Sequence, residues 1–135
     1  MATIDDVSAL EKVGDRLFDY PIKPKRAREF LNDSRHHLVL AYHQKEIVGM
    51  ASAIHYVHPD KNPTLFINEV SVLNDFQNKG IGRSLVKFMV DHGKYLGCTE
   101  AWVVTENSNK AARRAYVAAG GSEDEESVIL IEFKS

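Results

Sequence analysis

The spacing of hydrophobic residues predicts two helices followed by a hairpin in the first half of the chain. Apolar residues recur at helical intervals over residues 4–18, and Thr3 stands before them as an N-cap. A second, short helix is expected over residues 24–31, with its proline in the first turn. Two β-rich stretches, 37–42 and 47–56, flank a polar turn and predict an antiparallel pair of strands.

The next stretch predicts a strand with an irregularity. In residues 64–73 the apolar alternation breaks between Ile67 and Val70, which indicates a β-bulge near Asn68 or Glu69. A regular strand with a period of two would not show this break.

The pattern of the residues after this strand predicts a helix, a strand, a second helix and a last strand. An amphipathic helix over residues 81–96 ends at Gly97, and a short buried strand is expected over 101–104. A helix over 107–119, with Ser108 as an alternative cap, and a last strand over 128–133 complete the series.

This order predicts an α/β fold with a mixed, mostly antiparallel central sheet, a bulged central strand and helices on both faces. The strand–helix–strand unit over residues 64–104 should cross over with parallel strands. With 135 residues and 44% apolar composition, the chain is expected to form a single domain spanning residues 1–135.

Composition excludes several classes of function. The net charge of -2 argues against a nucleic-acid partner, and the basic patch of Lys23, Lys25, Arg26 and Arg28 is interpreted as a solvated helix start. No apolar run approaches the ~20 residues of a membrane span, and no signal peptide precedes the domain, so a cytoplasmic protein is expected. The single cysteine, Cys98, allows no intrachain disulfide, and no metal site is predicted.

A glycine-containing loop lies where the bulged strand meets the long helix. Residues 77–84 would present free backbone N–H groups at the positive end of the helix dipole, and their glycines allow close approach of phosphate oxygens. Lys79, Arg83 and Ser84 add positive charge and a hydroxyl. These properties favour a pyrophosphate, although such a helix start is also often a simple turn.

Two common phosphate-binding patterns do not fit this loop. A dinucleotide site requires a third glycine where Leu85 stands. A nucleotide P-loop requires a lysine before Ser84, where Arg83 stands, and an upstream glycine that is absent.

Gln77-Asn78-Lys79-Gly80-Ile81-Gly82 resembles the Gln/Arg-x-x-Gly-x-Gly/Ala coenzyme A motif of the GNAT superfamily of N-acetyltransferases. Residues 109–120 are similar to its second signature, Asn-x-x-Ala-x-x-x-Tyr-x-x-x-Gly, and the bulged strand over 66–73 resembles its central strand. The resemblance covers residues 38–133.

Three features depart from the family pattern. The first strand is short or missing, and Gln77 replaces the commoner arginine. Gly121 replaces the usual aromatic residue, which resembles the GNAT-type aminoglycoside 3-N-acetyltransferases.

The resemblance implies acetyl transfer from acetyl-CoA to an amine and names the residues expected to bind coenzyme A. These are Val70, Ser71, Val72, Gln77, Asn78, Lys79, Gly80, Ile81, Gly82, Arg83, Ser84, Asn109, Ala112 and Tyr116. A helix-capping role is the alternative for Asn109.

Two residues are expected to move protons. An alkyl ammonium, with a pKa of roughly 10, must lose a proton before it attacks a thioester. Glu69 is the candidate general base, and its alternative role is to attract the cationic substrate. By resemblance, Tyr116 would protonate the departing thiolate; its alternative is a packing role in the core.

The acceptor is expected to be a small cationic amine such as an aminoglycoside or polyamine, because acidic residues collect near the predicted acceptor side and would attract a cation. Glu69, Glu106 and Tyr56 are the predicted substrate-binding residues, whereas the acidic run over 123–126 is more simply a solvated loop. A peptide or protein N-acetyltransferase with an open groove and a non-catalytic acyl-CoA-binding module remain alternatives. The missing first strand leaves a sheet edge that a second subunit could cover in a homodimer.

Overall fold

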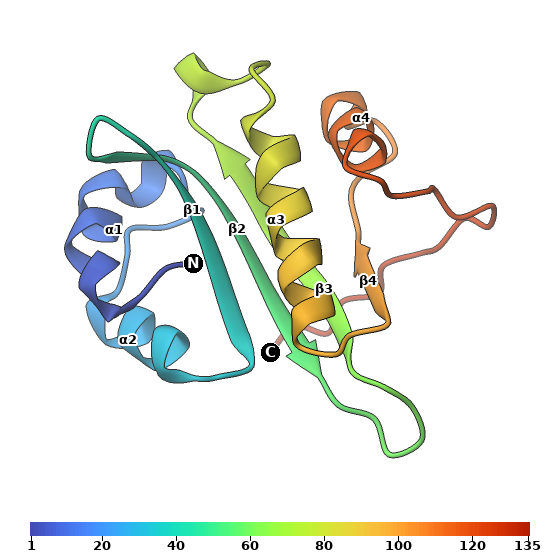
Figure 1. Ribbon diagram of the computed structural model, residues 1–135. Coiled ribbons are helices and arrows are strands. Elements are labelled where there is room, and N and C mark those ends of the chain that lie inside the picture. The colour runs from blue at the N-terminus through green and yellow to red at the C-terminus, as the bar shows by residue number, and fades with distance from the viewer.

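The protein is built on a four-stranded sheet in the order β1-β2-β3-β4, seen in a computed structural model that describes all 135 residues (Figure 1). The strands are β1 (His36–His43), β2 (Glu46–Tyr56), β3 (Thr64–Val72) and β4 (Glu100–Val103). Neighbouring strands are antiparallel from β1 to β3, whereas β3 and β4 are parallel. The predicted mixed, mostly antiparallel sheet is confirmed.

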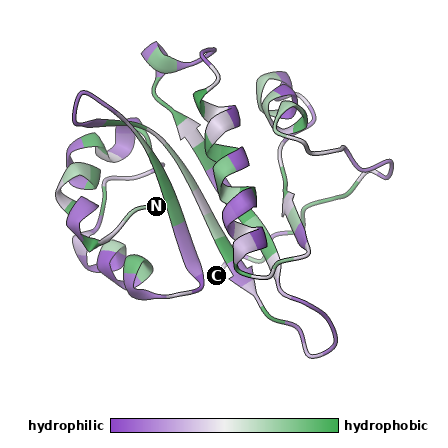
Figure 2. Ribbon diagram, viewed as in Figure 1, coloured by the Kyte–Doolittle hydropathy of each residue, from purple (hydrophilic) through white to green (hydrophobic).

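Helices cover both faces of the sheet, as predicted (Figure 1). Helices α1 (Val7–Val13) and α2 (Pro24–Asn32) lie on one face. Helix α3 (Ile81–Tyr95) lies on the other, with α4 (Lys110–Ala118) beside it. The helices present apolar residues inward and polar residues outward, so both colours mark each of them in Figure 2.

The first helix is shorter than the predicted span of residues 4–18. Thr3 is the N-cap as predicted, in a capping box with Asp6, but residues Ile4–Asp6 form a 3₁₀ turn before α1. Gly14 has a φ of 46°, which stops the α-helix at Val13, and a second 3₁₀ turn follows.

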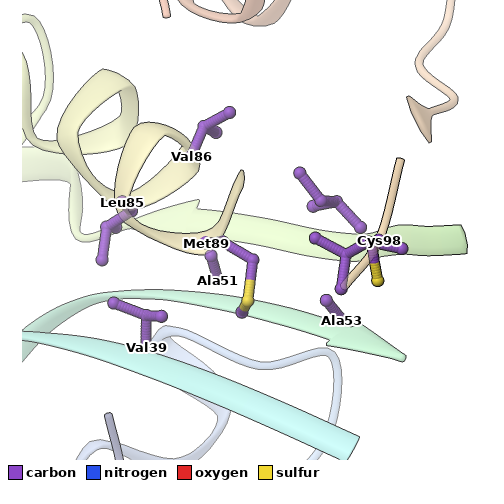
Figure 3. Close-up of a cluster of buried hydrophobic side chains, with 9 residues drawn as sticks. Val39, Ala51, Ala53, Leu85, Val86, Met89 and Cys98 are labelled. Atoms are coloured by element: carbon purple, nitrogen blue, oxygen red, sulfur yellow. The ribbon is translucent and has the colours of Figure 1, made fainter. Parts of the chain in front are cut away.

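Two apolar clusters hold the layers together. On the α3 face, side chains of the helix contact those of β1 to β3, and Figure 3 shows Met89 inserted between α3 and the strands beside Ala51. Met89, Ala51 and Leu65 are fully buried there. On the opposite face, Leu10 of α1 packs among strand residues that include Met50. The sheet is therefore covered by a separate core on each side.

The β-bulge predicted near Asn68 or Glu69 is present. Ser52 of β2 is paired with Glu69, but the next residue, Ala53, is paired with Ile67, so Asn68 is the extra residue. The bulge explains the broken alternation, because Ile67 and Val70 both contact the α3-side core while two residues between them turn to the other face.

The predicted last strand over residues 128–133 is wrong. This segment pairs with no strand, and the side chains of Val128, Ile129, Leu130, Ile131 and Phe133 are 72–96% exposed. The pattern has strand propensity, but a strand forms only against a hydrogen-bonding neighbour, and the chain places none beside this segment.

No regular strand precedes α1, as the sequence suggested. A single backbone hydrogen bond, from Ala2 N–H to Leu38 O at 2.8 Å, joins the N-terminal residues to β1. Strand β1 therefore forms an edge of the sheet.

Candidate active site

The glycine loop before α3 forms a cradle of free backbone donors. Asn78 and Gly80 adopt positive φ angles of 62° and 83°, and Gly80 is the N-cap of α3. The first backbone bond into the helix is donated by Ser84 to Gly80 O, and the N–H groups of residues 78–83 have no acceptor within the protein. A row of free donors at a helix N-terminus suits a phosphate or pyrophosphate.

Side chains around the cradle shape it and add charge. The Gln77 amide donates hydrogen bonds to Val72 O at 2.9 Å and to Asn74 Oδ1 at 3.3 Å, so it ties the loop to the end of β3. The Lys79 ammonium lies 5.6 Å from the Phe76 ring centroid, and Arg83 is exposed in the first turn of α3. Gln77 thus acts here as a loop-shaping residue, while the two cations are available to an anion.

The cradle continues into an open strand edge. Strand β4 pairs with β3 only from Thr64 to Ile67, opposite Glu100–Val103. Val70, Ser71 and Val72 therefore have β2 on one side and no strand on the other. An extended amide-containing arm can add to such an edge through main-chain hydrogen bonds.

Helix α4 flanks this opening and carries Tyr116. Asn109 is the N-cap of α4, and its Oδ1 accepts a hydrogen bond from Ala112 N–H at 3.1 Å. The Tyr116 ring packs half-buried against the α3-side core, and burial raises the pKa of its hydroxyl. No buried side-chain oxygen or nitrogen lacks a partner, and the Tyr116 hydroxyl makes no hydrogen bond, so this hydroxyl reaches solvent.

A cavity of about 500 Å³ lies on the opposite face, between the sheet and the α1–α2 layer. The bulge directs the consecutive residues Asn68 and Glu69 into it. Its remaining lining comes from α1, α2, the loop between them and two strands: Leu10, Phe18, Asp19, Tyr20, Pro21, Ile22, Lys23, Arg26, Ala27, Phe30, Leu31, Leu38 and Ser52.

Glu69 is the titratable group at the floor of this cavity. Burial raises the pKa of its carboxyl above the usual 4.5, and the negative charge of Asp19 raises it further. No hydrogen bond or ion pair within the protein engages the Glu69 carboxylate. A partly buried, unpaired carboxylate with a raised pKa has the properties of a proton acceptor.

The structure separates the other predicted substrate residues from this cavity. The Tyr56 hydroxyl accepts a hydrogen bond from Trp102 Nε1 at 3.2 Å, near the start of β4, and Tyr56 does not line the cavity. Glu106 does not line it either. In the acidic run, Glu123 forms an ion pair with Arg113 at 2.7 Å. Of the predicted acidic residues, only Glu69 faces the cavity.

Sequence reasoning missed Asp19, the second carboxylate of the cavity. It lies in the loop after α1, where nothing in the local pattern distinguishes it from a solvated acidic residue. The two faces meet at the bulge, since Glu69 lines the cavity and the edge of β3 that is not paired with β4 begins directly after Ile67.

The family of the chain follows from comparison with known proteins. A sequence model of the Acetyltransferase (GNAT) family matches residues 5–120. The chain belongs to the GNAT family. GNAT acetyltransferases use acetyl-CoA, so the chain is an acetyltransferase that transfers an acetyl group from acetyl-CoA to an amine. Among curated proteins, none is similar enough in sequence to count as a match.

Solved structures share the GNAT fold of this chain at low sequence identity. The aminoglycoside acetyltransferase meta-AAC0020 from an uncultured soil metagenomic sample, in complex with trehalose, superposes with a TM-score of 0.84 at 17% identity, covering 99% of this chain and 93% of that one. Aminoglycoside N-acetyltransferase AAC(6')-Iy in complex with CoA gives a TM-score of 0.79 at 20% identity, with coverages of 97% and 91%. A ribosomal-protein-alanine N-acetyltransferase from Brucella melitensis gives 0.76 at 15% identity, with coverages of 98% and 96%.

Two further properties bear on this GNAT domain. No group of three or more His, Cys, Asp or Glu side chains is placed to hold a metal ion. None of its helices combines the length and the apolar character that crossing a membrane requires.

Proposed function

We propose that this protein acetylates a primary amine that enters the cavity beside Glu69, with acetyl-CoA lying along the free edge of β3. One observation carries the proposal: the bulge presents Glu69 to the cavity at the point where β3 has lost its pairing with β4, since no residue of β3 after Ile67 pairs with that strand. Aminoglycosides, polyamines and peptide N-termini all carry the cationic amine that this site would accept. Proteins of similar fold include aminoglycoside acetyltransferases and a ribosomal-protein-alanine N-acetyltransferase, so both small-molecule amines and peptide N-termini are candidates.

The cofactor-binding residues would act in two groups. The free N–H groups of residues 78–83, with Lys79 and Arg83, would bind the pyrophosphate, and Ser84 would add its hydroxyl. Main-chain groups of Val70, Ser71 and Val72 would bond the pantetheine arm. Acetyl-CoA supplies an activated thioester carbonyl. Asn109 and Ala112 bond each other at the start of α4, so any contact with the cofactor would come from the remaining Asn109 amide group.

Glu69 would take a proton from the entering ammonium. Because the pKa of the Glu69 carboxyl is raised, it lies closer to the pKa of the amine, and this favours proton transfer. Asp19, which also lines the cavity, would attract the ammonium before the proton is removed.

Replacing Tyr116 by Phe is expected to lower kcat by about 10²-fold with little change in the Kd of acetyl-CoA. The hydroxyl makes no hydrogen bond within the protein and reaches solvent, so it is free to donate a proton to the leaving sulfur. Stopped-flow turnover and calorimetric binding would measure the two quantities. Tyr95→Phe is the matched control, since that tyrosine is 85% exposed on α3. A weaker affinity with normal kcat would instead indicate that Tyr116 only packs.

Release of free thiol from acetyl-CoA in the presence of a panel of primary amines tests the proposed function. An N-acetyltransferase releases one thiol for each acetylated amine, and mass spectrometry of the amine should show the acetyl group. A chain that binds acetyl-CoA and releases no thiol with any amine would be a binding module, and the proposal would fail.

A homodimer is proposed from the exposed apolar segment 128–133, because such a segment tends to pair with another chain. Replacing Ile129 and Ile131 together by Glu is expected to shift the protein from dimer to monomer, as measured by light scattering across a concentration series. Replacing Glu125 and Glu126 by Gln in the preceding loop is the control. A wild-type protein that stays monomeric at all concentrations would refute this proposal. The cytoplasmic location stays a prediction.

A further inference from the structure

The acceptor cavity carries charges of both signs. Asp19 and Glu69 are its carboxylates, and Lys23 and Arg26 are its cations. A site selected for polycations would be acidic throughout, because each additional ammonium group needs a compensating negative charge. This cavity instead has formal charges that balance.

The cations are concentrated where α2 begins. Lys23 precedes Pro24, and the first turn of α2 contains no acidic residue. The positive end of the α2 dipole and the positive side chains beside it repel each other. An anion bound there would be stabilised by the dipole and by the side chains. Arg26 is paired with Glu29 at 2.8 Å, whereas Lys23 takes part in no ion pair or side-chain hydrogen bond. Lys23 is therefore the cation available to a ligand. The four side chains of the basic patch are exposed, as expected for a solvated helix start, and two of them, Lys23 and Arg26, also line the cavity.

The rest of the cavity is largely apolar. Apart from the charged groups, much of its lining comes from side chains of α1, α2, the connecting loop and β1: Leu10, Phe18, Ile22, Phe30, Leu31 and Leu38. Hydroxyl-rich rings or polyamine chains with several ammonium groups would lose hydration against this surface, whereas an aliphatic or aromatic group would gain from burial.

We propose that the acceptor is a primary amine that also carries an apolar body and an anionic group, as an apolar amino acid or short apolar peptide does. This inference rests on the proposed N-acetyltransferase function. The ammonium group faces Asp19 and Glu69, the carboxylate faces Lys23, and the apolar body lies on the lining between them. Loss of the ammonium proton to Glu69 frees the amine lone pair for attack on the acetyl carbonyl carbon. A bond forms between the nitrogen and the acetyl carbon as the C–S bond breaks, and the second proton lost by the nitrogen balances the proton taken up by the departing thiolate.

A matched pair of acceptors tests the proposal through thiol release. Leucyl-leucine and leucyl-leucinamide have the same amine and apolar body, but only the first carries a carboxylate. We expect kcat/KM to be about 10-fold or more higher for leucyl-leucine, since a charge-assisted contact to Lys23 is present only there. Spermidine and an aminoglycoside are the polycationic acceptors in the comparison, and kcat/KM is expected to be lower for both than for leucyl-leucine.

Variants of α2 then locate the anion-binding group. Lys23→Gln should bring the ratio of kcat/KM for the two dipeptides close to one, and Lys23→Glu should reverse it in favour of the amide. Lys25→Gln is the control, because Lys25 lies on the same helix but does not line the cavity, and it should keep the wild-type ratio. Circular dichroism would show that each variant is folded.

The possible failures are distinguishable. Faster thiol release with spermidine or the aminoglycoside than with leucyl-leucine would overturn the inference and leave the N-acetyltransferase function intact. A ratio that Lys23→Gln does not change would overturn the assignment of Lys23. Binding of acetyl-CoA without thiol release from any of the four amines would overturn both the inference and the proposed function.

Discussion

Replacing Glu69 by Gln is expected to lower kcat by about 10²- to 10⁴-fold at neutral pH, the usual contribution of a general base. Gln keeps the shape of the side chain and its position on the bulge, but it cannot accept the ammonium proton. The expected loss is in kcat as well as in kcat/KM, and steady-state assays with a saturating amine would measure both. A raised KM with unchanged kcat would show that Glu69 only attracts the cationic amine.

The pH profile provides a second measurement of the same role. Burial and the Asp19 charge raise the pKa of Glu69, so the acidic limb of kcat/KM should lie above pH 4.5. Asp19→Asn removes the second cause, and this limb should move to lower pH while kcat changes little. An acidic limb that persists unchanged in Glu69→Gln would assign the titration to another group.

Acidification from pH 6.5 to 4 is expected to reduce the free energy of unfolding by about 3 kcal/mol through His37. His37 is 6% exposed, and burial, with the nearby His55 and His92, lowers its pKa from 6.5 to about 4. A lowered pKa in the folded state means that the stabilisation is complete above pH 6.5 and lost as the pH falls to 4. Urea unfolding at a series of pH values would measure the loss.

The arrangement of three imidazoles explains this sensitivity. His37 Nε2 lies 2.7 Å from His55 Nδ1, so one ring must donate a proton that the other accepts, and the pair cannot be fully protonated without losing this bond. The His92 ring, from α3, contacts His37 with its centroid 5.0 Å away. His36 adds unfavourable charge, and Asp33 is the acidic group that opposes these effects.

Two variants separate His37 from general acid effects. His37→Leu should flatten the decline in stability between pH 6.5 and 4. His43→Gln changes an exposed histidine of the same strand outside the cluster, and it should keep the wild-type decline. Equal slopes for wild type and His37→Leu would show that other groups control the acid sensitivity.

The sequence by itself determined the elements with strong local signals. The capping of the first helix by Thr3 and the end of the long helix near Gly97 depend on side chains and φ angles close in the chain, and both were predicted correctly. The bulge was also predictable, because one extra residue changes which face every later side chain takes, and the break between Ile67 and Val70 records this.

Tertiary structure decided the features that depend on partners distant in the chain. Residues 128–133 have the composition of a strand but no neighbour to pair with, so the local pattern misled. The two acidic residues predicted to bind the substrate are separated, since Glu69 lines the cavity and Glu106 does not. Electrostatic fields depend on distance in space, which local spacing does not encode.

The two parts of the candidate site therefore differ in how far the sequence alone predicts them. The glycine loop at the start of α3 is a local structure, so the prediction of a phosphate-binding cradle there follows from the order of residues in the sequence. The cavity beside Glu69 is assembled from two helices, a loop and three strands, and only folding brings Asp19 and Lys23 into its lining together with Glu69. The sequence identified an acetyltransferase of the GNAT family, whereas the amines proposed as its acceptors follow from charges that only the three-dimensional structure brings together.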